Sequence, residues 1–168
     1  MGGTTGDGRT VTERRSDRDL VVTRTFDAPV RLVYQAWTQA ELFQLWWAPK
    51  SSPVPMIGCE MDVRTGGGYS VSFGHDLASA MTFYGKYVDV VPDERIVWTN
   101  EESGQVTVTT VTFEDDDGRT RLTMHDRYPS KDALDATIAG AQDAAMDDPT
   151  SEQFRQLDDL LVTLVAKG

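Results

Sequence analysis

The sequence contains a single cysteine, Cys59, among 168 residues. One cysteine excludes an internal disulfide and any metal site built from several thiolates. Its apolar neighbours Ile57 and Met61 favour a small buried hydrophobic side chain over a reactive thiol. There are only two histidines, and a protein metal site needs three or four convergent ligands. We therefore predict neither a metal site nor a cofactor.

Basic residues are also scarce, with 16 Lys and Arg against 27 Asp and Glu, a formal net charge of −11. Nucleic acids select basic surfaces, so we expect no nucleic-acid partner. No apolar run approaches the ~20 residues that cross a bilayer, which predicts no membrane insertion. The first residues are polar and glycine-rich and lack the apolar stretch of a signal peptide. We expect a cytoplasmic protein with a flexible tail over 1–18 and a single domain over 19–168.

The stretch from Phe26 to Lys50 has the most defined local pattern. It follows a β-branched run over 20–26 that predicts a strand. Asp27 is expected to be the N-cap of a helix, with Pro29 just inside its start. Apolar residues at spacings of three and four, ending at Trp37, support this helix. A second short helix is predicted to open at Glu41 and to end before Pro49.

After residue 54 the apolar period changes from helical spacing to two, which indicates strands. They are expected over 54–63, 69–75, 81–91, 95–99, 105–114 and 119–126. The Asp-Gly pair within 115–118 predicts a tight hairpin, because Asp and Gly tolerate positive φ. Regular spacing with turn signals between the strands implies an antiparallel meander.

The last forty residues read as helical. Ser130 is expected to cap a helix that carries Leu134 and Ile138 on one face, and a second apolar stripe runs from Phe154 onward. Pro149 favours a break between them, because the residue before a proline avoids helical geometry. The sequence leaves open whether this region is one kinked helix or two.

Taken together, this order of elements and its motifs closely resemble the SRPBCC superfamily, the START-like or birch-allergen-like helix-grip proteins. The subfamily is the one similar to the C-terminal domain of the heat-shock-protein-90 ATPase activator. The resemblance implies an α+β fold in which a curved antiparallel sheet wraps around a long C-terminal helix, with two short helices after the first strand. One departure is near Gly140, where relatives often have a Gly-Trp pair. The motifs that carry the resemblance are Phe26-Asp27-Ala28-Pro29, Ala36-Trp37-Thr38, Trp46-Trp47-x-Pro49, Gly67-Gly68, Gly85-Lys86-Tyr87, Arg95-Ile96-Val97 and Leu122-Thr123-Met124.

The resemblance also implies a hydrophobic cavity between sheet and helix, in which superfamily members carry lipids, sterols, hormones or polyketides. Independently, a sheet face that alternates large and small residues under an alanine-rich helix leaves volume unfilled. We expect a small hydrophobic ligand there, the alternative being that the same residues simply fill a core. The candidate ligand-binding residues are Trp46, Tyr69, Phe73, His75, Phe83, Trp98, Phe113, Met124, Tyr128, Leu134 and Ile138.

The sequence indicates much less about catalytic residues than about the fold. His75 continues the apolar phase of its strand and is a weak candidate for a general acid–base group, or else an exposed residue at a strand end. His125 should point outward, because Leu122 and Met124 take the inward phase. A binding protein is favoured over an enzyme. A polyketide-type cyclase or dehydratase in the same cavity is the alternative, followed by a chaperone-regulating interaction module; a homodimer is possible.

Overall fold

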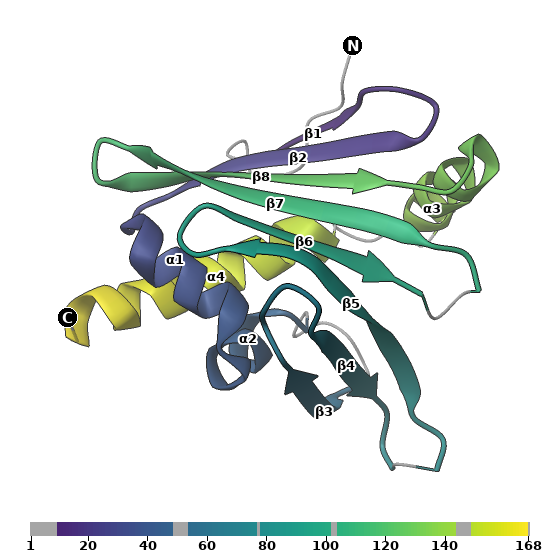
Figure 1. Cartoon of the computed structure of the whole chain (residues 1–168), viewed down its shortest axis with the longest axis horizontal. Helices are drawn as coiled ribbons and strands as arrows, with labels where there is room; N and C mark the ends of the chain where they lie inside the picture. The colour runs from purple at the N-terminus through teal and green to yellow at the C-terminus, as the bar shows by residue number, and fades with distance from the viewer. Residues whose placement is uncertain (1–9, 49–53, 77, 102–103, 144–148, 168) are drawn as a thin grey trace.

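The computed structural model describes residues 10–48, 54–76, 78–101, 104–143 and 149–167, with the side chains of 140–151 left out. One eight-stranded antiparallel sheet has the order β1-β2-β8-β7-β6-β5-β4-β3. The long helix α4 runs beneath this sheet, beside α1 and α2 (Figure 1). The α+β helix-grip architecture is therefore confirmed. The strands are β1 (Val11–Arg14), β2 (Asp19–Phe26), β3 (Met56–Met61), β4 (Gly68–Phe73), β5 (Met81–Val91), β6 (Arg95–Asn100), β7 (Thr107–Asp116) and β8 (Arg119–Arg127), and the helices are α1 (Val30–Thr38), α2 (Ala40–Trp46), α3 (Lys131–Asp143) and α4 (Pro149–Lys167).

Strand β5 joins two halves of the sheet. Its first half pairs with β4, in the register Tyr69 opposite Gly85, and its second half pairs with β6, in the register Tyr87 opposite Trp98. A register shift between Tyr87 and Asp89 marks the bulge after this change of partner, and bulges bend and twist a strand. As a result β3 and β4 form an arm that extends away from the β2–β8–β7 half (Figure 1).

Helix α4 is anchored to the sheet by an apolar face and one buried ion pair. Phe154 is 1% exposed and packs edge-to-face on Phe26 of β2, with ring centroids 5.4 Å apart. The guanidinium of Arg24, also on β2, pairs with the carboxylate of Asp158 and lies 5.3 Å from the Phe26 ring centroid. This contact places α4 across the concave face of the sheet.

Two glutamines of α4 bind the end of α2. The last carbonyls of a helix have no partners within the helix. Gln156 donates from Nε2 to the carbonyls of Trp46 and Ala48, at 3.0 and 2.9 Å, and Gln153 donates to the carbonyl of Trp47. Amide donors from α4 therefore satisfy the exit of α2 and hold both tryptophans in place.

Two local expectations need correction, and one open question is answered. Residues 11–14, assigned to a flexible tail, pair with β2 as β1, while residues 1–9 lie outside the described residues. Asp27 does not cap α1: the N-cap is Pro29, without a side-chain cap, and the chain enters the helix extended. The sequence left open whether the C-terminal region is one kinked helix or two, and the structure answers this: α3 ends at Asp143 and a separate α4 begins at Pro149, as the proline favoured.

Other local expectations are confirmed. The hydroxyl of Ser130 accepts a hydrogen bond from the backbone N–H of Ala133 at 3.1 Å, so it caps α3. Asp117 and Gly118 have φ of 55° and 87° in the β7–β8 hairpin, the left-handed geometry that favours such residues. Within the described ranges, no helix is both long and apolar enough to cross a membrane.

Candidate functional site

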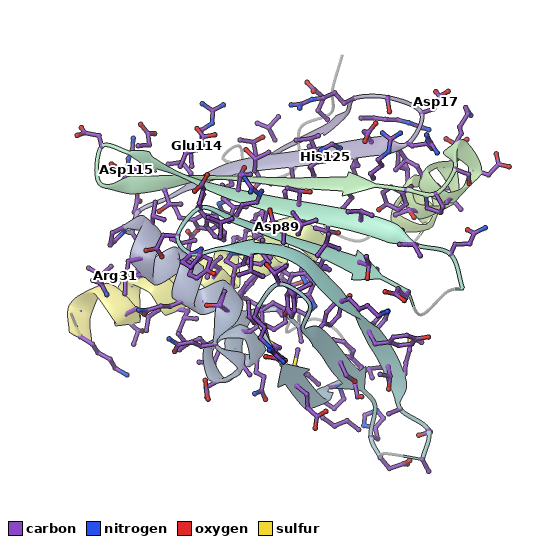
Figure 2. The ribbon with its side chains drawn as sticks, in the orientation of Figure 1. Asp17, Arg31, Asp89, Glu114, Asp115 and His125 are labelled. Carbon is purple, nitrogen blue, oxygen red and sulfur yellow. The ribbon has the colours of Figure 1, made fainter. Side chains whose placement is uncertain are left out.

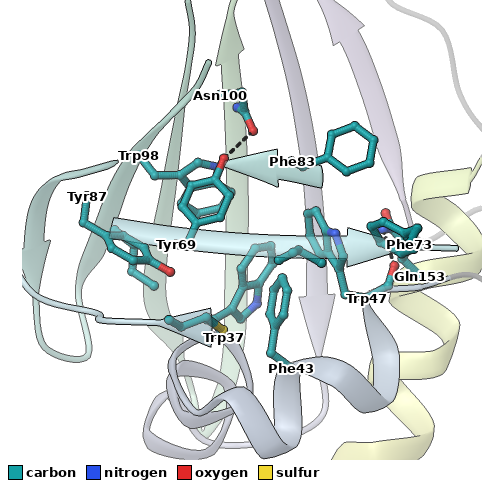
Figure 3. A pocket seen from close by; sticks show the side chains of 13 residues that line it. Trp37, Phe43, Trp47, Tyr69, Phe73, Phe83, Tyr87, Trp98, Asn100 and Gln153 are labelled. Atoms are coloured by element: carbon teal, nitrogen blue, oxygen red, sulfur yellow. Dashed lines mark hydrogen bonds between the residues drawn. The ribbon is translucent and has the colours of Figure 1, made fainter. Parts of the chain in front are cut away.

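A cavity of about 260 Å³ lies between the concave face of β4, β5 and β6 and the three helices α1, α2 and α4. Aromatic rings make up most of its wall (Figure 3). The volume is enclosed on the sheet side by alternate residues of three neighbouring strands, and on the helix side by the ends of α1 and α2. Its lining residues are Trp37, Phe43, Trp47, Met61, Tyr69, Val71, Phe73, Phe83, Tyr87, Ile96, Trp98, Asn100 and Gln153.

Four of the sequence-derived candidates line this cavity. Tyr69 and Phe73 lie on β4, Phe83 on β5 and Trp98 on β6. All four occupy the concave phase of their strands, as the alternation in the sequence requires. Phe73 and Phe83 meet edge-to-face, with ring centroids 5.6 Å apart, and Phe83 is 36% exposed.

Three other candidates fill the core instead. Trp46, Phe113 and Met124 are all buried, and none of them lines the cavity. The indole N–H of Trp46 donates to the carbonyl of Ala36 at 2.9 Å, so this side chain ties α2 to α1. Phe113 packs edge-to-face on Tyr34 and Trp37 of α1. Helix α1 covers this part of the sheet, so the inward-facing residues of the strands there belong to the core.

The remaining four candidates lie away from the cavity. His75 is exposed in the bend after β4, because that strand ends at Phe73. The cyclase alternative thereby loses its candidate acid–base group. Tyr128, Leu134 and Ile138 belong to α3 or its approach, and α3 sits at the end of β8 instead of across the cavity (Figure 1). Burial raises the pKa of Tyr128 to about 12, so its phenol stays neutral.

Nine lining residues were not among the candidates. Some carried a usable signal: Val71 lies between Tyr69 and Phe73 in the same strand phase, and Trp37 ends the apolar stripe of α1. For Gln153, on the polar side of the helical pattern, the sequence offered none. The residues missed are Trp37, Phe43, Trp47, Met61, Val71, Tyr87, Ile96, Asn100 and Gln153.

The lining includes no Asp, Glu, Lys, Arg or His side chain. Several of its aromatic side chains carry a hydrogen-bond donor, among them Trp37 and Tyr87. The indole Nε1 of Trp37 is buried and has no hydrogen-bond partner in the described part of the chain. The hydroxyl of Tyr87, a residue 5% exposed, points inward (Figure 3), and burial raises its pKa, which keeps it protonated. The hydroxyl of Tyr87 can donate a hydrogen bond into the cavity, whereas neighbouring atoms cover the N–H of Trp37.

A hydrogen-bonded row of side chains leads from the cavity to a half-buried carboxyl group. The hydroxyl of Tyr69 lies 2.8 Å from both Oδ1 of Asn100 and the carbonyl of Thr99 (Figure 3). Nδ2 of Asn100 donates to Oγ1 of Thr109 at 3.2 Å, and Oγ1 of Thr109 donates to Oδ1 of Asp126 at 2.6 Å. The row crosses β4, β6, β7 and β8 on one face of the sheet.

A second polar cluster lies on the opposite face, around Asp19. His125, labelled on β8 in Figure 2, contacts Oδ1 of Asp19 through Nε2 at 2.7 Å, and Ser16 donates to Oδ2 at 2.5 Å. The carboxylate therefore lies between serine and histidine, so the histidine cannot take the serine proton as a nucleophile triad requires. Arg127 completes the cluster at 3.0 Å. The position of this cluster on the outer face confirms the outward orientation expected for His125. The cluster binds the β1–β2 hairpin to β8.

This cluster predicts a specific acid sensitivity. Hydrogen bonds from Ser16 and His125 lower the pKa of Asp19 from 3.8 to about 2. Because the pKa of Asp19 is lower in the folded than in the unfolded protein, its ionised carboxylate stabilises the fold at any pH above the unfolded-state pKa. This contribution is lost as the pH falls from about 4 to about 2. Allowing for solvent screening, we expect Asp19→Asn to cost about 1 kcal/mol at neutral pH.

Urea unfolding of both proteins across the acid range tests this expectation. The difference in unfolding free energy should be constant at neutral pH and shrink toward zero below the ordinary pKa of aspartate. Asp17→Asn, which changes an exposed carboxylate of the same hairpin (Figure 2), is the control. A difference between wild type and Asp19→Asn that persists undiminished in acid would show that Asp19 acts through shape and not through charge.

No group of three or more His, Cys, Asp or Glu side chains in the described ranges is placed to hold a metal ion. The cavity is therefore best described chemically as an aromatic, uncharged binding site with a few hydrogen-bonding groups.

Comparison with known proteins gives the wider context. Residues 27–162 match the family described as Activator of Hsp90 ATPase homolog 1-like protein. A crystal structure of a protein from Rhodobacter sphaeroides superposes with a TM-score of 0.79 at 23% identity, over 91% of this chain and 97% of that chain. Proteins from Mycobacterium smegmatis and Nitrosomonas europaea both give TM-scores of 0.73, at 23% and 21% identity, over 91% of this chain and 97% and 99% of theirs. No functionally curated protein matches the sequence. At these identities the structural neighbours support the fold alone.

Proposed function

Because the chain belongs to the family of Activator of Hsp90 ATPase homolog 1-like proteins, whose helix-grip fold is known for ligand binding, we propose that it binds a small hydrophobic molecule. The observation that carries the proposal is the aromatic cavity bounded by β4, β5, β6 and the helix ends. A cavity lined by rings and lacking charge favours an apolar occupant over water.

The volume limits the size of that molecule. An apolar cavity of about 150 Å³ is large enough to bind benzene. A cavity of about 260 Å³ is then suited to two fused rings or an equivalent branched chain. Sterols and long lipids exceed this volume. A ligand of this size, contributing about 0.6 kcal/mol per non-hydrogen atom, would bind with a Kd on the order of 10 µM.

The lining also limits the charge of the ligand. A buried ion without a paired counter-charge is strongly unfavourable, and none of the lining side chains carries a formal charge. The chain as a whole has a net charge of −11, which further disfavours anions. We therefore propose a neutral ligand that carries one or two polar atoms, to one of which Tyr87 donates a hydrogen bond.

A cavity-filling substitution tests the proposal. Val71 is 4% exposed and faces the cavity from the middle of β4. In Val71→Phe the added ring should occupy empty volume, so we expect stability within about 1 kcal/mol of wild type and at least ~10-fold weaker binding of 2-naphthol. Calorimetric titration measures the affinity, and urea unfolding measures the stability.

The matched control is Val111→Phe. Val111 is 0% exposed on the same concave face but does not line the cavity. Overpacking this closed site should cost about 1–3 kcal/mol while leaving the affinity of the folded protein for 2-naphthol nearly unchanged. If Val71→Phe destabilises the protein as strongly as Val111→Phe does, the proposed cavity is packed. Absence of any naphthalene-type binding to wild type would remove the proposed function.

A further inference from the structure

The half-buried carboxyl group of Asp126 lies outside the cavity and has no part in its lining. It sits on β8, opposite Thr109 of β7 and Leu20 of β2. It shares the concave phase with Leu122 and Met124, both buried. A carboxyl group facing inward in an apolar sheet is costly unless it is hydrogen-bonded, so its position calls for a functional explanation.

Asp126 fixes the direction of the hydrogen bonds along the row that reaches the cavity. An ionised carboxylate only accepts hydrogen bonds, and a threonine hydroxyl has one proton. As long as Asp126 is ionised, Thr109, 2.6 Å away, must therefore donate to it. The oxygen of Thr109 can then only accept from its other neighbour, Asn100, 3.2 Å away.

The orientation of the Asn100 amide follows from this constraint. Its NH₂ group has to face Thr109, and its carbonyl oxygen has to face Tyr69 and the cavity. The two ends of an asparagine amide have nearly the same shape, so only the hydrogen-bond network decides between the orientations. A carbonyl oxygen accepts two hydrogen bonds, so Oδ1 can accept one from a ligand as well as one from Tyr69.

Resting on the proposed ligand cavity, we propose that Asp126 is a positioning residue that acts through Thr109 to present the carbonyl oxygen of Asn100 to the ligand. The cavity then selects a neutral two-ring molecule whose polar atom is a hydrogen-bond donor, such as a hydroxyl group. When Asp126 is protonated it can donate to Thr109, which can donate to Asn100, and the amide can turn its NH₂ group to the cavity. The selection for a donor is then lost.

The groups around Asp126 determine the pH range in which this change should occur. Burial raises the pKa of Asp126, opposed by the hydrogen bond from Thr109 and by His125. The other ionisable groups around it are Arg127 on its own strand, Tyr128 directly after that strand, and Asp19 on β2, which pairs with Arg127 and His125 on the opposite face. The group that faces it from β7 is the uncharged Thr109. The preference for a ligand that donates a hydrogen bond should therefore fade as the pH is lowered. This loss should occur at a pH above the ordinary titration range of aspartate.

A matched pair of probes measures the selection directly. 2-Naphthol donates a hydrogen bond, whereas 2-methoxynaphthalene has the same ring system and can only accept one. Titration of wild type at neutral pH should give a 3–10-fold preference for 2-naphthol, the equivalent of one hydrogen bond of about 1 kcal/mol. The preference should decrease as the pH is lowered.

Two variants separate positioning from general structure. Thr109→Val keeps the shape of the side chain but breaks the link between Asp126 and Asn100, and Asp126→Asn removes the titrating group. Both should bind the two probes with nearly equal affinity, without dependence on pH. Thr123→Val, on β8 but in the opposite phase, should retain both the preference and its pH dependence. Circular dichroism confirms that each variant is folded.

The outcomes distinguish this inference from the function on which it rests. If neither probe binds wild type, the proposed function fails and the role of Asp126 fails with it. If both probes bind with equal affinity, or if Thr109→Val keeps the preference and its pH dependence, the cavity stands but Asp126 does not direct it.

Discussion

Replacing Asp158 by alanine is expected to lower the free energy of unfolding by about 3 kcal/mol. Its partner Arg24 has a side chain only 1% exposed, and the substitution removes the carboxylate of Asp158 from this guanidinium. Breaking a buried ion pair from one side typically costs about 3–5 kcal/mol, because an uncompensated charge remains. The side chain of Asp158 is 23% exposed, so water can enter, which places the cost at the lower end. Urea unfolding measures the change.

Two controls make this result interpretable. Asp159→Ala removes a neighbouring exposed carboxylate from the same helix and should change stability by less than about 0.5 kcal/mol. The double variant Arg24→Met with Asp158→Leu removes both charges and should recover most of the loss, since apolar replacement of a buried pair is often neutral. A double variant as unstable as Asp158→Ala would show that the hydrogen bonds of Arg24, such as that to Thr10, matter more than its charge.

Period-two alternation allowed most of the sheet to be derived from the sequence, because it reports which side of a strand is apolar. The strand β1, Val11–Arg14, was missed because its sequence shows little of this alternation. It is short, lies at an edge and alternates weakly, and its pairing with β2 supplies order that its composition does not indicate. Tertiary pairing overrode local propensity there.

The candidate site could be predicted only in part, because the phase of a strand shows which face a residue is on but not whether a helix covers it there. Tyr69 and Phe113 both take the concave phase of their strands. Phe113 is covered by α1 and becomes core, while Tyr69 lies where β5 turns away and a cavity remains. Which inward residues are covered depends on where α1 and α4 cross the sheet, and no periodicity in the chain encodes that crossing.

The misplacement of Leu134 and Ile138 has a related cause. Both lie on an apolar helical stripe, and a single long helix would have carried them over the cavity. The region is divided into α3 and α4, and the helix that contacts α1 and α2 is α4. Gln153 of α4 therefore occupies the cavity wall. The polar pattern of Gln153 and Gln156 gave no signal, because their partners are backbone carbonyls of α2.

Gly85 connects the two halves of the sheet, opposite the lining residue Tyr69. A Cβ atom added there would lie 1.8 Å from the carbonyl oxygen of Thr99 and 2.7 Å from its carbonyl carbon. Tyr69, directly opposite Gly85, reaches past it to the same carbonyl with a hydroxyl contact of 2.8 Å. The absence of a side chain at residue 85 thus lets β6 approach β5 and lets Tyr69 bridge to β6.

Gly85→Ala should therefore be among the most damaging single substitutions near the cavity. The clash is with backbone, which a rotamer change cannot relieve, so we expect a loss of at least about 3 kcal/mol in unfolding free energy. Displacement of the Thr99 carbonyl should also abolish measurable 2-naphthol binding in the protein that remains folded. The matched control is Gly58→Ala on β3, whose Cβ would meet Ser72 at an ordinary 3.5 Å and should change stability by less than about 1 kcal/mol. Equal stabilities of the two variants would mean that β5 and β6 do not approach at Gly85 as closely as described, and that the bridge from Tyr69 does not shape the cavity.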